Sequence, residues 1–217
     1  MRCPFCVEQL RPAARGIDLV AQRAVEADDR RYFDALGETL RVLRPLDPSV
    51  SVTGGEPTKD PRLPRLLRTL RDAGARKRTL TTNGSGLLDR AEGREVLDWI
   101  LDTGVRHLNI SRAHPDPARN REIMAPPEDA PVERIPEIAR RAKAAGSRVR
   151  LSCVLLRGAV DSFEGVLRYL DFAAAAGVDN VVFRQLMLAD GCACGPHPVA
   201  RYSDGHRVRL APLLDRV

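Results

Sequence analysis

Short apolar segments alternate with amphipathic segments along most of this chain, and this alternation restricts the fold more than any other feature of the sequence. The apolar segments are rich in leucine and β-branched residues and have lengths typical of strands. They are residues 49–53, 78–82, 105–110, 148–156 and 180–186. Strands that alternate with helices form parallel sheets joined by helical crossovers, so the sequence predicts an α/β fold.

The segments between these strands have the apolar spacing of helices. Helices are predicted over residues 28–43, 63–73, 87–102, 131–145 and 163–176. Each of the last four is followed by a glycine, which is common where a helix ends. These glycines are Gly74, Gly104, Gly146 and Gly177.

Polar and glycine-containing residues follow the predicted strands. In parallel α/β folds, functional residues gather at the carboxyl ends of the strands, whether the sheet closes into a barrel or stays open. The strand ends read TGGEP (residues 53–57), TTNG (81–84), NISR (109–112) and RQ (184–185). The sequence therefore predicts a functional site at this edge of the sheet.

Composition and charge exclude several other classes of protein. The 217 residues are 43% hydrophobic and 29% charged, which fits one globular domain and not a disordered chain. The net charge of +6 comes almost entirely from arginine. Because these arginines are interleaved with acids, without a basic block or accompanying aromatics, we expect a solvated surface and no nucleic-acid partner.

The N-terminus and the cysteines indicate where the protein works. No apolar leader follows Met1, and no apolar run is long enough to span a bilayer, so we expect a cytoplasmic protein without a membrane partner. The cysteines are five, an odd number, and two of them lie three residues apart near the N-terminus. Without an export signal, this pattern favours metal-binding thiols over disulfides.

Two motifs carry candidate chemistry. The CPFC motif (residues 3–6) places two thiols where one tight loop can bring them to one metal centre, although half of a zinc site or a redox dithiol has the same spacing. The GGEP motif (residues 54–57) places paired glycines and a carboxylate at a strand end, where backbone can approach a ligand closely. An ordinary strand-to-helix turn is the alternative interpretation of GGEP.

Together, these motifs resemble the radical S-adenosylmethionine (SAM) superfamily. Its cluster loop reads C-x-x-x-C-x-φ-C, with φ aromatic, and its second strand ends in GGEP. Phe5 occupies the aromatic position, and TNG (82–84), NISR (109–112) and FRQL (183–186) follow in the family's order. The resemblance extends from Cys3 to about Leu188. It implies a [4Fe–4S] cluster held by three thiolates, with one iron open to SAM.

The resemblance also implies a role for each matching residue. Cys3 and Cys6 would ligate two irons, and Phe5 would lie against the adenine of SAM. Gly54, Gly55 and Glu56 would hold the methionyl amino group. Ser111 and Arg112 match a pair that contacts the ribose and the carboxylate of SAM. Asn83 would shape the third-strand loop of the SAM site. Arg184 would face either SAM or the substrate.

The first cysteine of the cluster motif is expected two residues before Met1, and the first strand of the family's barrel is expected before it. A late start or a fragment would explain both differences, and a degenerate relative that has lost its cluster is the alternative. Cys153 is expected to pack as a small buried hydrophobe. A second metal site would need more ligands than Cys192, Cys194 and His197, so we expect a flexible tail in that segment. His114 is expected to be solvated.

The sequence thus predicts a partial (β/α)6 barrel of the TIM type without its first strand. Residues 1–190 would form the radical SAM core and residues 191–217 an irregular C-terminal extension. By resemblance, the protein would cleave SAM reductively, take electrons from a donor such as flavodoxin or ferredoxin, and attack an unidentified small molecule or peptide. Two alternatives are a non-catalytic SAM- or metal-binding partner protein and a zinc-containing nucleic-acid-binding protein.

Overall fold

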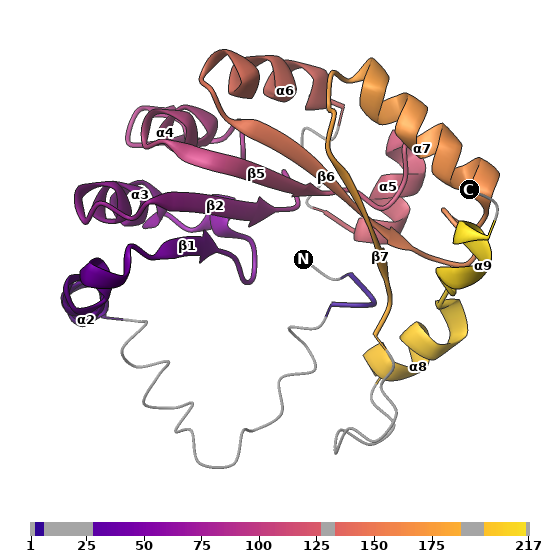
Figure 1. The fold of residues 1–217 in the computed structure, drawn as a ribbon, viewed down its shortest axis with the longest axis horizontal. Helices are drawn as coiled ribbons and strands as arrows, with labels where there is room; N and C mark the ends of the chain where they lie inside the picture. Colours follow the sequence, from indigo (N-terminus) through magenta and orange to yellow (C-terminus); the bar gives the residue numbers. More distant parts are fainter. Residues whose placement is uncertain (1–2, 7–27, 127–132, 188–197, 216–217) are drawn as a thin grey trace.

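The computed structural model describes residues 3–6, 28–126, 133–187 and 198–215, and within them a five-stranded parallel sheet organises the chain (Figure 1). The strand order is β1-β2-β5-β6-β7. The strands are β1 (Ser49–Val52), β2 (Lys77–Thr82), β5 (Val105–Ser111), β6 (Arg148–Leu155) and β7 (Val181–Gln185). All five agree with the predicted strands to within one or two residues. The predicted α/β class with a partial barrel is therefore confirmed.

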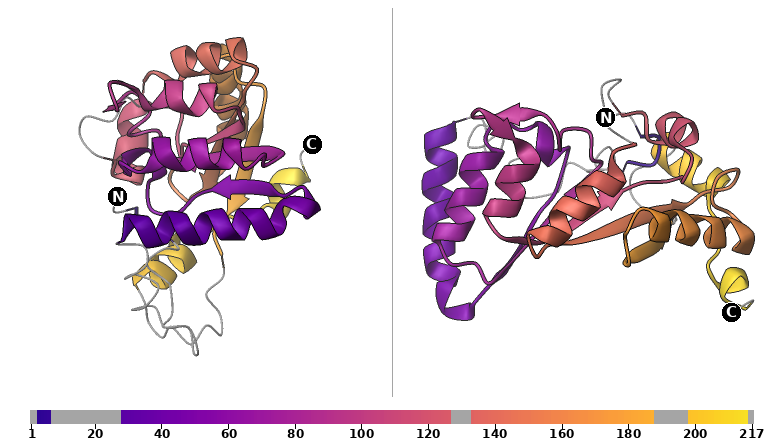
Figure 2. Two further views of the ribbon diagram at one scale, coloured as in Figure 1. Left: turned by 90° about the vertical axis from the view of Figure 1, so that its left-hand side faces the viewer. Right: turned by 90° about the horizontal axis from the view of Figure 1, so that it is seen from above.

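Four helices connect successive strands and cover the outer face of the curved sheet (Figures 1 and 2). They are α3 (Leu63–Asp72), α4 (Val96–Asp102), α6 (Ile135–Ala144) and α7 (Phe163–Ala175). Helix α2 (Asp29–Leu43) precedes β1 and packs beside α3. It begins where the Asp28 side chain accepts a hydrogen bond from the Arg31 N–H at 3.0 Å, a typical N-cap.

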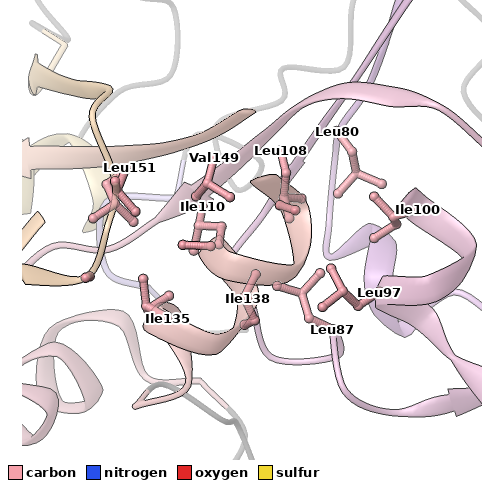
Figure 3. Close-up of a cluster of buried hydrophobic side chains, with 14 of the residues drawn as sticks. Leu80, Leu87, Leu97, Ile100, Leu108, Ile110, Ile135, Ile138, Val149 and Leu151 are labelled. Carbon is pink, nitrogen blue, oxygen red and sulfur yellow. The ribbon is translucent and has the colours of Figure 1, made fainter. Parts of the chain in front are cut away.

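The hydrophobic core lies between the sheet and these helices (Figure 3). Alternate strand residues point outward into it, and the helices contribute the facing side chains. Leu80, Leu108 and Leu151 from three neighbouring strands are each 0% exposed. They belong to one cluster with Leu97, Ile100 and Ile138 from the helices. The apolar half of each strand is thus used to hold the helices in place.

The other half of each strand forms the inner face of the sheet, and it is polar. Because Val149, Leu151 and Cys153 belong to the core, alternation places their neighbours on the opposite side. We define the inner face as the strand residues that alternate with the core on β2, β5, β6 and β7. They are Lys77, Thr79, Thr81, His107, Asn109, Ser111, Arg148, Arg150, Ser152, Val154, Val182 and Arg184. A polar face of this kind contacts solvent or ligands. It does not provide the apolar layers that fill the interior of a closed barrel.

Three segments differ from the sequence prediction. Residues 87–102 were predicted as one helix, but a two-stranded hairpin of β3 (Arg90–Ala91) and β4 (Arg94–Glu95) precedes α4. Its turn places Glu92 and Gly93 at φ of 50° and 78°, the left-handed region that a tight hairpin requires. The Trp99 indole N–H donates to the Ala91 carbonyl at 2.8 Å and fixes the hairpin on α4.

Three further helices in the described residues were not predicted. Helix α5 (Pro117–Met124) follows β5, and its N-cap is Asp116, whose side chain accepts from the Arg119 N–H. The C-terminal extension predicted as irregular contains α8 (Pro198–His206) and α9 (Ala211–Leu214). In the described parts of the chain, every helix is too short or too polar to cross a membrane.

Candidate functional site

The N-terminal cysteines lie in one tight turn at the carboxyl-end side of the sheet. The Cys6 N–H donates to the Cys3 carbonyl oxygen at 3.1 Å, so the two thiols project from a single loop. Both are free thiols. Cys3 is only 3% exposed and packs in a small apolar cluster with Ala113, Leu156 and Leu186. Burial raises the pKa of the Cys3 thiol to about 12.

Helix α8 packs against this turn. The ring of Tyr202 lies 6.2 Å from the ring of Phe5, centroid to centroid, and stacks on His206 at 4.0 Å. The helix is anchored to the end of β6, where the Arg157 N–H donates to the His206 carbonyl at 2.9 Å. Sequence reasoning missed this contact because no local pattern connects residues 198–206 to the N-terminal turn.

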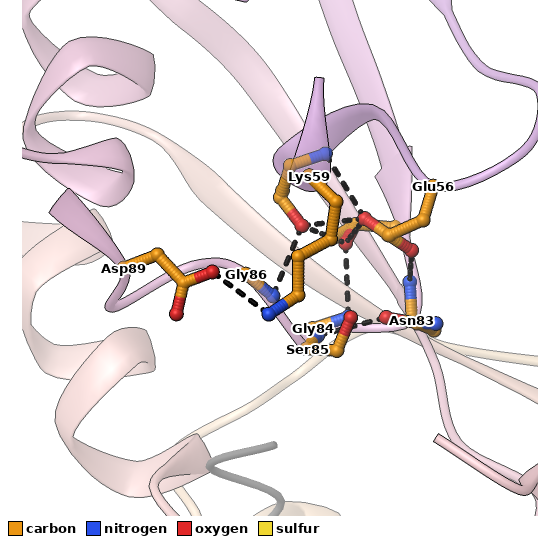
Figure 4. A network of polar contacts seen from close by, with 9 residues as sticks. Glu56, Lys59, Asn83, Gly84, Ser85, Gly86 and Asp89 are labelled. Carbon is orange, nitrogen blue, oxygen red and sulfur yellow. Dashed lines mark hydrogen bonds and ion pairs between the residues drawn. The ribbon is translucent and has the colours of Figure 1, made fainter. Parts of the chain in front are cut away.

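The GGEP motif forms the turn that leaves β1. Gly54 and Gly55 have φ of 99° and 52°, values that side-chain-bearing residues rarely adopt. This turn brings the Glu56 carboxylate to the end of β2 (Figure 4). Its Oε2 accepts from the Asn83 N–H at 2.7 Å, and its Oε1 accepts from the Thr58 N–H at 3.1 Å. The hydroxyls of Thr58 and Thr82 also donate to Oε1.

Glu56 therefore joins two strand ends. Each carboxylate oxygen offers two acceptor positions; three of the four donors address Oε1 and one addresses Oε2, so Oε2 keeps a position for a further donor. Thr58 and Thr82 are 3% and 2% exposed, so the donors that Glu56 satisfies are buried. The predicted contact of Glu56 with the amino group of SAM remains a prediction. In the structure, the carboxylate holds the GGEP turn against the TNG turn.

Asn83 shapes the second of these turns. Its side-chain oxygen accepts from the Ser85 N–H at 2.8 Å, as in an Asx turn. Asn83 and Ser111 line one small cavity at the carboxyl ends of β2 and β5, together with Arg112. The structure thus brings these three predicted residues close together.

Ser111 and Arg112 nevertheless point to opposite sides of the sheet. Ser111 is on the inner face, whereas Arg112 is 2% exposed on the helix side. The Arg112 guanidinium lies 4.8 Å from the Phe172 ring centroid and donates to the Pro115 carbonyl at 2.7 Å. Burial lowers the pKa of Arg112. Its predicted contact with the SAM carboxylate would require the side chain to leave α7, so the geometry favours Ser111 over Arg112 at this end of β5.

Arg184 lies on the inner face with Ser111. Its Nε donates to the Ser152 hydroxyl at 2.9 Å, and Ser152 pairs in register with Ser111. Arg150 and Asn109 were not singled out from the sequence, yet they share this face. The alternation of polar and apolar residues in RVRLSC (148–153) is the signal that could have found Arg150.

Cys3 and Cys6 match two corners of a [4Fe–4S] cluster in ligand type and spacing. Within the described ranges, no group of three or more Cys, His, Asp or Glu side chains is arranged to hold a metal. The donor set thus fits two of the three thiolate positions. Cys153 is fully buried at the end of β6, as predicted, and Cys192, Cys194 and His197 lie outside the described residues.

His114 lies in the loop between β5 and α5 and lines a pocket with Gly165 and Arg168 of α7. It is partly exposed, and its Nδ1 accepts from the Asp116 N–H at 3.0 Å. Burial lowers its pKa. These contacts leave it outside the group formed by the strand-end residues.

The chain is similar in sequence to curated enzymes. A GTP 3′,8-cyclase from Rhizobium etli (strain CIAT 652) is 29% identical over 192 residues, which are 87% of this chain and 49% of the enzyme. The chain therefore spans about half the length of this relative.

Solved structures share the fold. Coproporphyrinogen III oxidase (HemN) from Escherichia coli, a radical SAM enzyme, superposes with a TM-score of 0.60 at 18% identity, over 98% of this chain and 47% of HemN. Streptococcus suis SuiB bound to S-adenosylmethionine gives 0.59 at 19% identity, over 85% of this chain and 39% of SuiB.

The family model described as the radical SAM superfamily matches residues 1–173, which include the cysteine turn and the first four strands of the sheet. The cofactors of that family, SAM and a [4Fe–4S] cluster, are the two predicted from the motifs. The resemblance noted in the sequence is thereby confirmed, and this chain belongs to the radical SAM superfamily.

Proposed function

We propose that this chain is the catalytic core of an enzyme that cleaves SAM reductively and abstracts a hydrogen atom from its substrate. The observation that carries the proposal is the CxxC turn, with Cys3 buried, beside the polar strand ends of a parallel sheet. Family membership supports the same reaction type. The reaction of the whole protein is part of the proposal, because the chain spans about half of its curated relative.

Cys3 and Cys6 would hold two irons of the cluster, and Phe5 and Ser111 would contact SAM, as predicted. When bound, the reduced cluster and SAM supply a 5′-deoxyadenosyl radical that removes a substrate hydrogen. The protein contributes binding, orientation and exclusion of competing reactions. Tyr202 and Leu186 pack against the turn that carries the two thiols, and this packing limits the access of water.

The glycine turn has an orienting role in this proposal. Gly54 and Gly55 expose backbone groups at the end of β1, because their positive φ values turn the chain away from the sheet. Glu56 fixes that turn to Asn83, so the ends of β1 and β2 form one rigid platform. A rigid platform places SAM without the entropy cost of ordering a loop on binding.

We further propose that residues 1–190 form the radical SAM core and that residues 191–217 are a C-terminal extension, of which helix α8 packs against the cysteine turn. An electron donor such as flavodoxin or ferredoxin would reduce the cluster. The substrate is proposed to be a small molecule, because the curated relative is a GTP 3′,8-cyclase. Location in the cytoplasm stays a prediction from the sequence.

Iron binding tests the cluster assignment directly. The protein, together with any residues that its gene encodes before Met1, is reconstituted anaerobically with iron and sulfide, and iron per chain and the visible absorbance of the cluster are measured for wild type, Cys6→Ala and Cys153→Ala. We expect Cys6→Ala to lose the cluster and Cys153→Ala to keep it, since Cys153 lies in the core. A cluster retained by Cys6→Ala would contradict the assignment. The nucleotide sequence in frame before the Met1 codon shows whether a cysteine codon lies two positions upstream.

A further inference from the structure

We propose that a pocket on the helix side of the sheet binds a free α-amino acid with a short apolar side chain, and that Arg168 and Asp171 hold its carboxylate and its ammonium group. The pocket lies between the β5–α5 loop and helix α7, and we call it the outer pocket. The described residues that line it include none of the inner-face residues, so it is separate from the site proposed for SAM.

The outer pocket has the size of a site for a small ligand. Its volume is about 380 Å³, at the lower end of the range for small-molecule pockets. Gly165 of α7 contributes to this space, because a Cβ added at this position would lie 3.7 Å from Val160. A small metabolite therefore suits the pocket better than a large cofactor does.

One part of the pocket is apolar. Pro115, Ala159 and Val160 line this part. Val160 is 1% exposed and belongs to the hydrophobic core, so its position is fixed by packing. A preformed apolar surface favours a ligand that carries an apolar group, because contact removes apolar area from water.

The other side chains of the pocket carry both signs of charge. Arg168 and Asp171 come from α7, and His114 and Asp116 come from the β5–α5 loop. Asp116 already caps α5, since it accepts from the Arg119 N–H at 2.9 Å. Arg168 and Asp171, in contrast, form no ion pair or side-chain hydrogen bond within the described residues. These two charges are thus available to a ligand.

The separation of Arg168 and Asp171 is informative. The chain pairs two other arginines with the acid three residues later, Arg119 with Glu122 and Arg134 with Glu137. Asp171 is one methylene shorter than those glutamates, so a gap remains between its carboxylate and the guanidinium. Residues three apart on a helix have Cβ atoms about 5–6 Å apart. The carboxylate and the ammonium group of an α-amino acid are attached to one carbon atom, so they fit between charges at this spacing.

His114 supplies a further donor for the ligand carboxylate. Its Nδ1 accepts from the Asp116 N–H at 3.0 Å, so the proton of the neutral ring is on Nε2. Burial lowers the pKa of His114, which favours this neutral ring. The Nε2–H is therefore left to donate within the pocket.

Other classes of ligand fit the charges less well. A simple anion would meet Asp116 and Asp171, and a simple cation would meet Arg168. Within the described ranges, no group of three or more Cys, His, Asp or Glu side chains is arranged to hold a metal ion. A peptide terminus carries only one of the two charges. A zwitterion with both charges on one carbon atom satisfies Arg168 and Asp171 together.

The test is calorimetric titration of the full chain with L-valine and L-leucine. The variants are Arg168→Gln and Asp171→Asn. Their matched controls are Arg140→Gln on α6 and Asp34→Asn on α2, which remove exposed residues with the same changes in charge. Circular dichroism and the unfolding midpoint establish that each variant is folded. We expect each pocket variant to bind about tenfold more weakly or worse, and each control to stay within about twofold of wild type.

Two analogues test the charges of the ligand without any substitution in the protein. Leucinamide lacks the carboxylate and N-acetyl-leucine lacks the ammonium group, so each is expected to bind wild type about tenfold more weakly than leucine. Equal binding of leucinamide would indicate a peptide amino terminus as the ligand and overturn the proposal. Equal binding of N-acetyl-leucine would indicate recognition of a carboxylate alone and overturn it too.

The proposal would also be overturned if neither amino acid gave saturable binding up to about 10 mM. Wild-type affinity in Arg168→Gln and Asp171→Asn, or an equal loss in the two controls, would place the amino acid elsewhere and have the same consequence. The titration needs neither the cluster nor SAM. Arg168-dependent leucine binding in a protein that fails to cleave SAM would therefore refute only the proposed function.

Discussion

Replacing Glu56 tests whether its carboxylate anchors the two strand-end turns. In Glu56→Gln, one side-chain oxygen becomes an NH₂ group, which must face the N–H of either Asn83 or Thr58 because the two oxygens accept from these two donors. One donor therefore loses its acceptor in either orientation. Leaving a buried donor unsatisfied costs about 1–3 kcal/mol. Glu56→Ala leaves both backbone donors without the carboxylate, for about 2–6 kcal/mol.

The hydroxyls of Thr58 and Thr82 lie 3.4 Å apart and can pair with each other once the carboxylate is gone. Because this pairing compensates part of the loss, the destabilisation by Glu56→Ala should lie below the upper end of the range given above. The assay is urea denaturation followed by circular dichroism, with the free energy of unfolding taken from linear extrapolation. The control is Glu38→Gln, because Glu38 forms an exposed ion pair with Arg41 and its loss is expected to leave stability unchanged.

Equal stability of Glu56→Gln and Glu38→Gln would refute the anchoring role. If Glu56→Gln also bound SAM at least tenfold more weakly while keeping wild-type stability, the carboxylate would be a direct SAM ligand, as the sequence motif alone predicts. The structure instead predicts that Glu56→Gln is less stable than wild type even when no cofactor is bound.

Three further substitutions test the packing and the charge of the sheet. Leu97→Ala removes a fully buried side chain from the core and should cost about 2–5 kcal/mol of unfolding free energy in urea denaturation. Gly86→Ala should destabilise by about 1–3 kcal/mol in the same assay, since its Cβ would lie 2.6 Å from the Thr58 carbonyl oxygen. Arg150→Gln should raise the pKa of His107, followed by NMR of its ring protons, because one of the cations that lower it is removed. Because the pKa of His107 is lowered in the folded protein, its contribution to stability is present above the unfolded pKa and declines as the pH falls toward the folded pKa. Arg150→Gln should make this decline in stability smaller.

Much of the fold could be predicted because each strand signals itself locally. The strands at residues 105–110 and 148–156 are β-branched or leucine-rich and end in polar residues, and both form within one or two residues of the prediction. The hairpin before α4 was missed because the helical spacing of Leu97, Ile100 and Leu101 was extended back across Glu92 and Gly93, which form a turn. Local periodicity cannot separate a helix from a hairpin when the same apolar residues fill the core in both.

The candidate site was predictable only at the level of motifs. GGEP and TNG lie at the ends of β1 and β2, but a motif does not tell which face of a strand each residue occupies. Alternation decided this for Ser111 and Arg112, which are adjacent in sequence and lie on opposite sides of β5. The packing of Tyr202 on the cysteine turn depends on tertiary contact between the two ends of the chain, and no local signal carries it.

The most direct test of the account is the formation of 5′-deoxyadenosine from SAM. The reconstituted protein is reduced anaerobically with dithionite, incubated with SAM, and analysed by liquid chromatography and mass spectrometry beside Cys6→Ala and Cys153→Ala. The account predicts 5′-deoxyadenosine and methionine from wild type and Cys153→Ala and none above background from Cys6→Ala. Formation at the wild-type rate by Cys6→Ala, or no formation by a wild-type protein that holds its cluster, would contradict it.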